Sequence, residues 1–220
     1  MNFSGNGLKI GRQLLSFILL LSATAALAQS PRAVLERYCK LDGSGKQLEP
    51  PNGSSPSGWH QLARMFVLED LSSVGAPIAK AWYSKVVVIK GYTIDGPTMD
   101  GPDRAQLTVH YLGLGEIDPE SLVFSPWGKL PASQSAATYT LLWTTKHFDL
   151  NSNGEEVLAT SPTSWKIKGL PPIPHVTVEP AIRYVARMRD VASKVEIKSN
   201  ANSTIATLNA LRSDFQHDAR

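Results

Sequence analysis

The sequence predicts an α+β fold with helices first and a curved antiparallel sheet second. Two observations lead to this fold class. Apolar residues recur every three to four positions up to about residue 66 and every second position from about residue 85 onward. The alternating segments are long, and turn-forming residues separate them, which is typical of an antiparallel meander.

The first helix is predicted to begin at Pro31, because Ser30 is a good N-cap residue and proline suits the first helical position. Val34 and Tyr38 then follow at helical spacing. The run at residues 42–45, Asp-Gly-Ser-Gly, ends the helix.

A second short helix is predicted where apolar residues are spaced i, i+3, i+4 and i+7. These residues are Trp59, Leu62, Ala63 and Phe66. Residues 66–82 show no pattern from which their structure can be predicted.

Four strands are predicted from the second half of the chain. The first is Val86–Ile94, which is rich in β-branched residues and stops at Asp95-Gly96-Pro97. The others cover residues 104–114, residues 136–148 and an irregular segment that is clearest at Ser164–Lys168. In the second of these strands, Leu107, Val109 and Tyr111 face one way while Gln106, Thr108 and His110 face the other.

The end of the chain is predicted to be helical. Residues 169–174 form a proline-rich connector, and Thr177 then caps a helix. Residues 199–203 interrupt this helix, and Thr204–Leu211 forms a final short one.

The first 28 residues have the three parts of a secretory signal peptide. Lys9 and Arg12 precede an apolar run at Leu14–Leu27, and Ala26–Ala28 provides a small-residue cleavage site before Gln29. An apolar run of this length is short for a bilayer, so cleavage is favoured over a retained membrane anchor. The expectation is an exported protein, periplasmic or secreted, with a signal peptide at 1–28, a domain at 29–198 and a C-terminal extension at 199–220.

The charge balance excludes one class of function. Of the 22 basic residues, two lie in the predicted leader, and the other 20 face 19 acidic residues. No basic run or stripe is present, so the sequence predicts no nucleic-acid binding.

The single cysteine, Cys39, is expected to be a small buried apolar group.

Several segments together resemble the nuclear transport factor 2-like superfamily, and specifically its exported members. They match its first two helices, a characteristic strand, a late strand with a tryptophan, and a C-terminal ending: Val34–Gly43, Trp59–Leu62, Val88–Tyr92, Ser164–Ile167, and Pro174–Val176 followed by Ala181–Tyr184. The resemblance implies a cone in which N-terminal helices pack on a strongly bent sheet. It implies no single activity, because relatives include isomerases, dehydratases and non-catalytic binding proteins.

No linear motif for metal, cofactor or nucleophilic catalysis is present. The stretch at Asp149–Gly154 begins like a calcium loop, but Thr160 occupies the position of the required glutamate. The five histidines show no ligand spacing. We therefore expect no metal and no cofactor. The candidates for lining a pocket are the aromatic residues Tyr38, Trp59, Tyr92, Tyr111, Tyr139, Trp143 and Trp165.

The first functional hypothesis is a non-catalytic domain that binds a small, partly apolar ligand or a protein partner. The alternative is an isomerase or hydro-lyase that uses a buried carboxylate and a tyrosine, because an apolar pocket raises the pKa of a carboxyl group. A carboxylate inside the pocket, with a strongly raised pKa and next to a phenol, would favour the enzyme. If no Asp or Glu lined the cavity, the enzyme hypothesis would be dropped. A third hypothesis is an envelope module that self-associates, for example as a homodimer.

Overall fold

The computed structural model describes residues 29–49, 61–62, 64–67, 85–127, 134–150, 156–169 and 173–218. The predicted leader, Trp59 and residues 68–82 lie outside these ranges. The elements within them are α2 (Pro31–Gly43), η2 (Lys46–Leu48), β1 (Phe66–Val67), β2 (Val86–Met99), β3 (Arg104–Ile117), β4 (Phe124–Pro126), β5 (Gln134–Leu150), β6 (Glu156–Lys168), β7 (His175–Thr177), α5 (Val178–Val191) and α6 (Val195–Asp218).

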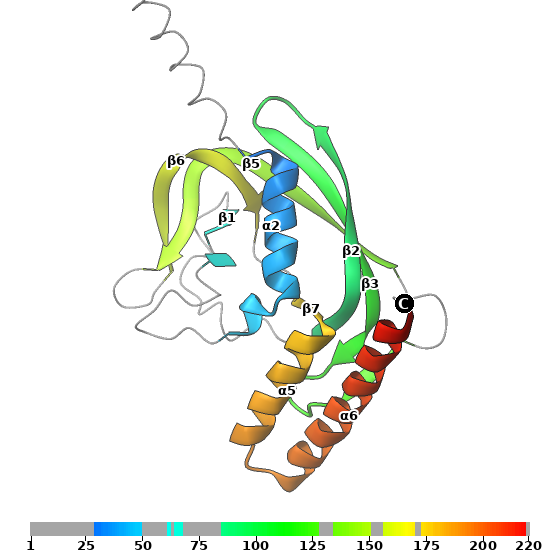
Figure 1. Ribbon diagram of the computed structural model, residues 1–220. Coiled ribbons are helices and arrows are strands. Elements are labelled where there is room, and N and C mark those ends of the chain that lie inside the picture. Colours follow the sequence, from blue (N-terminus) through cyan, green and yellow to red (C-terminus); the bar gives the residue numbers. More distant parts are fainter. Residues whose placement is uncertain are drawn as a thin grey trace, which may run out of the picture.

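The strands form one mixed sheet that curls into a half-barrel with α2 inside the curl (Figure 1). Its strand order is β1-β6-β5-β3-β2-β7, and β4 pairs with β3. The four long strands β2, β3, β5 and β6 are antiparallel to one another, whereas β1 and β7 are short parallel strands at the two edges. The α+β prediction with a strongly curved sheet is therefore confirmed.

The curl has a local cause in β2. The register of β2 on β3 shifts between Val88 and Ile89, and again between Ile89 and Gly91. Such bulges bend a strand and increase its twist. In the first part of β2, Val86 and Val88 pack with the C-terminal helices, whereas Val87, Ile89 and Ile94 belong to the core that contains α2.

Three sequence predictions are wrong. Strand β2 does not stop at Asp95-Gly96-Pro97, because a register shift between Asp95 and Thr98 absorbs this turn-like triplet and pairing continues to Met99. Phe66 is not helical but lies in β1, opposite Ile167. Residues 199–203 do not interrupt a helix, since α6 is continuous across them and the chain turns at residues 192–194 instead.

Helix α2 forms as predicted. The Ser30 hydroxyl oxygen accepts a hydrogen bond from the Ala33 backbone N–H, and Pro31 occupies the first turn. One face of the helix is buried against the sheet, including Leu35, Tyr38 and Asp42. The position of α2 within the curl brings the polar residues of this face against the inner side of the sheet.

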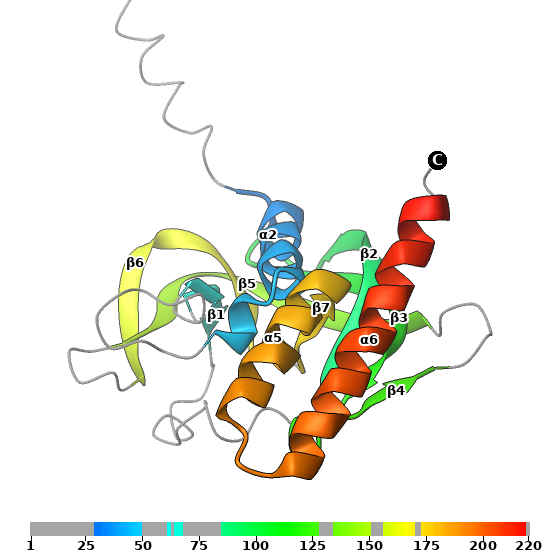
Figure 2. The same ribbon diagram turned by 60° about the horizontal axis from the view of Figure 1, so that its bottom comes forward.

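The C-terminal helices α5 and α6 form a hairpin beside the first part of β2 and the last part of β3 (Figure 2). Thr204 on α6 is 4 % exposed and joins α6 to the turn before β4. Its hydroxyl donates to the Leu122 carbonyl (2.8 Å) and accepts from the Phe124 N–H (3.0 Å). Ala201 and Leu208 are buried on the same side of α6 as Thr204. The largely polar sequence of α6 therefore still contains one buried helix face.

Two glycines of β3 allow aromatic rings from the β4 segment to approach the sheet closely. A methyl group on Gly113 would lie 2.2 Å from the Trp127 ring, and one on Gly115 would lie 2.6 Å from the Phe124 ring. Both aromatic side chains therefore cover backbone where any larger residue would clash.

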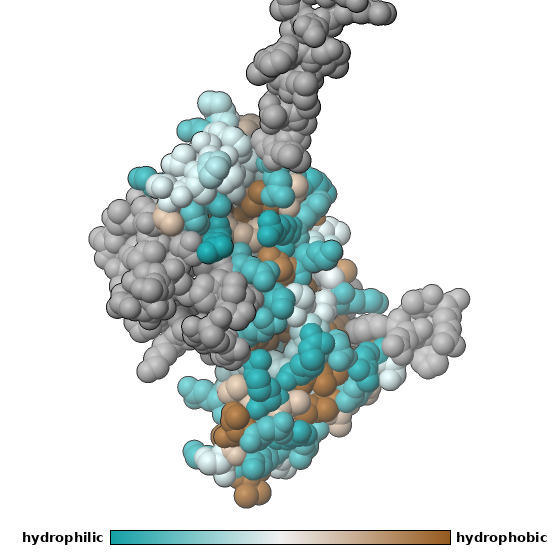
Figure 3. Space-filling model, turned by 60° about the vertical axis from the view of Figure 1, so that its left-hand side comes forward, coloured by the Kyte–Doolittle hydropathy of each residue, from teal (hydrophilic) through white to brown (hydrophobic). Residues whose placement is uncertain are grey.

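The surface of the hairpin end is partly apolar, as Figure 3 shows at the lower end of the molecule. Val191 and Val195, which flank the turn between α5 and α6, are 72 % and 83 % exposed.

Among the helices that the structure describes, none is both long and apolar enough to cross a membrane.

Candidate functional site

A group of buried polar side chains lies between α2 and the inner face of the sheet. Tyr38 and Asp42 come from α2, Tyr111 from β3, Tyr139 from β5 and His175 from β7. None of the five is more than 9 % exposed. We call these residues the Asp42 cluster. Four elements that are far apart in the sequence therefore place their polar groups at one point.

The carboxyl group of Asp42 is at the centre of the cluster. Its Oδ2 atom accepts a hydrogen bond from the His175 backbone N–H (3.1 Å) and a longer one from the Tyr38 hydroxyl (3.4 Å). Its Oδ1 atom is buried and has no hydrogen-bond partner among the described residues. Burial raises the pKa of Asp42 well above its ordinary value, while the two hydrogen bonds only partly oppose this rise.

His175 is neutral at physiological pH. Its ring stacks on Tyr111, with 3.8 Å between ring centroids and an angle of 9° between ring planes. Burial lowers the pKa of His175 to about 4, and a hydrogen bond to the Ile173 backbone only partly opposes this effect. The Nδ1 atom lies 3.8 Å from Asp42 Oδ2 and has no hydrogen-bond partner in the part of the chain that the structure describes.

The tyrosines form the other side of the cluster. The hydroxyl groups of Tyr111 and Tyr139 are hydrogen-bonded at 2.8 Å, and the Tyr139 ring lies 5.7 Å from that of Tyr38. Burial raises the pKa of all three phenols, so each keeps its proton and can donate it in a hydrogen bond. Burial also raises the pKa of the adjacent Cys39 to about 12, which leaves an unreactive thiol.

The buried polar groups of the Asp42 cluster lower the stability of the folded protein. A buried polar atom without a partner costs about 1–3 kcal/mol. Within the described residues, the Asp42 cluster contains two such atoms, one on Asp42 and one on His175. A carboxyl of raised pKa, a neutral imidazole and three phenols at one point can together donate, accept and move protons. Within the described residues, no group of His, Cys, Asp and Glu side chains could hold a metal ion.

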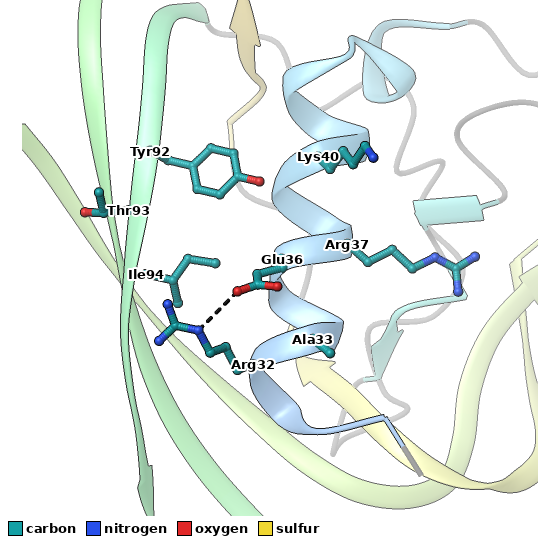
Figure 4. Close-up of a pocket in the computed structure, with 8 residues that line it drawn as sticks. All are labelled: Arg32, Ala33, Glu36, Arg37, Lys40, Tyr92, Thr93 and Ile94. Carbon is teal, nitrogen blue, oxygen red and sulfur yellow. Dashed lines mark hydrogen bonds and ion pairs between the residues drawn. The ribbon is translucent and has the colours of Figure 1, made fainter. Parts of the chain in front are cut away.

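A groove of about 790 Å³ opens at the surface on the other side of α2 from the cluster. Helix α2 forms one wall of this groove and β2 forms the other (Figure 4). Its lining comprises Arg32, Ala33, Glu36, Arg37 and Lys40 from the helix and Tyr92, Thr93 and Ile94 from the strand. Tyr92 lies opposite Tyr111 in the β2–β3 register, so the groove and the cluster share a stretch of sheet.

The aromatic candidates predicted from the sequence lie in three places. Tyr38, Tyr111 and Tyr139 meet in the Asp42 cluster, and Tyr92 lines the groove. Trp143 and Trp165 face each other across β5 and β6, with ring centroids 5.5 Å apart. Trp59 lies outside the described residues.

Sequence reasoning missed Asp42 and His175 as site residues. Asp42 was interpreted only as part of the sequence that ends a helix. One signal was available, because Asp42 follows Tyr38 by four residues and so lies on the same helix face. His175 gave no comparable signal, since its place beside Asp42 depends on the pairing of β7 with β2.

No family model matches this chain, and neither a curated protein nor a solved structure is found that matches it. The resemblance to the nuclear transport factor 2-like superfamily therefore remains a prediction.

Proposed function

We propose that this domain is an exported enzyme that transfers a proton on a small molecule, as an isomerase or a hydro-lyase does. The observation that carries the proposal is a fully buried carboxyl group, Asp42, with a raised pKa and a phenol within hydrogen-bonding distance. This combination supports the enzyme hypothesis over a purely binding domain. Asp42 does not line the described groove, so it meets the pKa and phenol parts of the criterion and not the pocket part. A role in binding alone becomes the second hypothesis, and self-association remains a prediction.

Asp42 is the proposed acid–base group. As a carboxylate of raised pKa it is a stronger base than an ordinary aspartate, and in its protonated form it can return the proton. The hydroxyl groups of Tyr38, Tyr111 and Tyr139 are the proposed donors to an oxygen that gains negative charge during the reaction. The role proposed for His175 is to position the acid, because its backbone N–H holds Asp42 Oδ2.

The cluster is closed in the structure, so a substrate has to displace part of its cover. His175, at 9 %, and Tyr139, at 6 %, are its most exposed members. The proposal therefore implies that a small substrate enters on this side and that its polar group takes the hydrogen bonds which Asp42 Oδ1 and His175 Nδ1 lack.

Isotope exchange tests the proposal without a known substrate. A panel of small ketones and hydroxy-carbonyl compounds is incubated with the protein in D₂O, and exchange of the proton next to the carbonyl is followed by NMR. Loss of an acid–base group costs about 10²–10⁴-fold in rate, so Asp42→Asn is expected to abolish the exchange. Asp95→Asn, an exposed carboxylate on the outer face, is the matched control.

A direct titration tests the carboxyl group itself. The ¹³C signal of the Asp42 carboxyl is expected to titrate well above pH 3.8. A midpoint at the ordinary value, or a panel in which no compound exchanges faster than in buffer, would contradict the enzyme proposal.

A further inference from the structure

Strand β2 has one edge that is paired only toward its two ends. Near the start of the strand, β7 pairs with residues 87–89 on this edge. Further along, the Gly96 carbonyl accepts a hydrogen bond from the Arg32 guanidinium (3.2 Å). Between these points, residues 91–95 pair with β3 on one side and, among the described residues, with no strand on the other. We call this stretch the open edge of β2.

The strand register shows which backbone groups lie on the open edge. The Trp143 N–H of β5 donates to the Asp103 carbonyl, and β5 pairs with β3 in unbroken register beyond this point. Backbone groups alternate in direction along a strand, so every second residue of β3 after Asp103 pairs with β5 and not with β2. Two of these β3 residues lie opposite Tyr92 and Ile94. The N–H and C=O groups of Tyr92 and Ile94 therefore point away from β3, toward the open edge.

The backbone groups of Tyr92 and Ile94 have no hydrogen-bond partner in the part of the chain that the structure describes. Ile94 is 6 % exposed, so little of this residue, backbone included, is in contact with water. Nearly all buried backbone N–H and C=O groups of folded proteins are paired. The open edge therefore offers donors and acceptors in the order that an added β-strand satisfies.

The groove between α2 and β2 runs along the open edge. Thr93 lines the groove although its side chain points away from the helix in Figure 4, so the strand backbone forms this part of the wall. The helix wall extends from Arg32 to Lys40, which is about 12 Å along the helix axis. An extended chain of four residues is about 13 Å long. The groove is therefore long enough for a short strand that pairs with β2.

The element that already occupies this edge indicates the kind of occupant. Strand β7 is an extended segment of three residues that pairs with β2 immediately before the open edge. A second copy of this chain fits less well. Edge-to-edge pairing of two copies would place both α2 helices on the same face of one continuous sheet, and the groove face of each helix carries three cations and one carboxylate. A single uncharged segment meets no such repulsion.

We propose that the open edge binds an extended, uncharged peptide segment of another protein. The segment adds as a strand beside residues 91–95, with its backbone paired to Tyr92 and Ile94 and alternate side chains directed toward α2. Proline lacks the backbone N–H, so it is the residue that this pairing excludes. The open edge lies outside the Asp42 cluster, and the proposal does not rest on the proposed proton transfer.

Hydrogen exchange of the free protein tests whether the edge is unpaired. The amides of Tyr92 and Ile94 are expected to exchange at least tenfold faster than that of Thr93, which lies between them and points to β3. Similar protection of all three amides would overturn the proposal, because it would show that the edge is already paired.

The probe is an uncharged peptide, blocked at both ends, with the sequence Ser-Thr-Val-Thr-Val-Thr-Ser. In its control, two adjacent prolines replace the central threonine and the second valine, so the control lacks a donor on each edge. Binding to the isotope-labelled protein is followed by NMR. The first peptide is expected to shift and protect the Tyr92 and Ile94 amides and to bind at least tenfold more tightly than the control.

The substitution Glu36→Trp tests the place of binding. The Glu36 side chain points from α2 toward Tyr92 and Ile94 (Figure 4), so an indole at this position covers the open edge. The variant is expected to weaken peptide binding at least tenfold. The matched control, Glu196→Trp, makes the same change on α6 and is expected to leave binding unchanged. Both glutamates are exposed, so both variants should keep the fold.

Three further results would overturn the proposal. They are equal binding of the two peptides, equal binding by the two tryptophan variants, and a dimer by light scattering in which the Tyr92 and Ile94 amides are protected without peptide. The last result would assign the edge to a second copy of the chain. Asp42→Asn separates this proposal from the proposed enzyme, because it should abolish proton exchange and leave peptide binding unchanged.

Discussion

The stability of the protein should fall as the pH is lowered through the range in which an ordinary histidine gains its proton, and His175 should cause most of this fall. Burial lowers the pKa of His175 from 6.5 to about 4 in the folded protein. A group whose pKa is depressed by folding favours the folded state above its unfolded pKa, and this stability is lost as the pH falls toward the folded value. At pH 5 the loss is about 2 kcal/mol relative to pH 7.

The substitution His175→Phe isolates this effect. A phenyl ring can retain the stacking on Tyr111, and the backbone N–H that binds Asp42 is unchanged. Titrating groups that lie far from His175 are present in both proteins and largely cancel in the comparison. We therefore expect the wild-type protein to lose about 2 kcal/mol more than His175→Phe between pH 7 and pH 5.

Urea unfolding followed by tryptophan fluorescence measures this difference. Thr177→Val is the control, because it removes the hydrogen bond from the Thr177 hydroxyl to the Gly43 carbonyl (3.1 Å) without removing a titrating group. It should lower stability by a similar amount at both pH values. If the wild-type protein and His175→Phe lost the same free energy between pH 7 and pH 5, the assignment of a buried neutral His175 would be refuted.

Three further predictions concern the fold and the cluster. Gly115→Ala should lower the free energy of unfolding by about 1–3 kcal/mol, because its methyl group would meet the Ser125 carbonyl oxygen and the Phe124 ring. Gly91→Ala enters open space and should change the free energy little, and equal urea midpoints for the two variants would contradict this prediction. Thr204→Val should cost about 1–3 kcal/mol by leaving the Phe124 N–H unpaired, while Thr207→Val, at an exposed position of the same helix, should cost less than half as much in the same assay. The raised pKa of Asp42 lowers the stability of the wild-type protein as the pH rises above 3.8. The stability of Asp42→Asn minus that of the wild-type protein should therefore be larger at pH 7 than at pH 4. The opposite order of urea midpoints would show that burial does not destabilise the carboxyl group.

The fold class could be predicted from the sequence because it depends on local periodicity. Alternation in β3, with Leu107, Val109 and Tyr111 buried, matches the pattern that the residues themselves show. The start of α2 was predictable for a similar reason, since Ser30 and Pro31 are local signals.

The errors arise where tertiary contacts override local signals. Gly96 and Pro97 are turn residues, but a shift in register lets β2 pair with β3 on both sides of them. In α6, residues 199–203 are polar and break no helix, because Ala201 and Thr204 pack against the sheet. The parallel edge strands β1 and β7 are two and three residues long, which is too short for any periodicity to be seen.

The candidate site shows the same limit more sharply. The tyrosines could be named from composition, but Asp42 and His175 come together only through the pairing of β7 with β2 and the position of α2 in the curl. Residues 133 apart in the sequence leave no spacing to detect. Linear motifs therefore could not identify this site.

The Asp42 cluster is difficult to explain by stability alone. Among the described residues, the hydrogen bonds of Asp42 all use Oδ2, so an asparagine side-chain carbonyl could accept them without the desolvation cost of a buried carboxyl group. The unpaired Oδ1 and the unpaired Nδ1 of His175 add a further cost. Natural proteins keep destabilising groups where an activity needs them. A fold that only had to pack its helix into a half-barrel would be more stable with apolar residues at both positions, so the polar pair itself supports a chemical role.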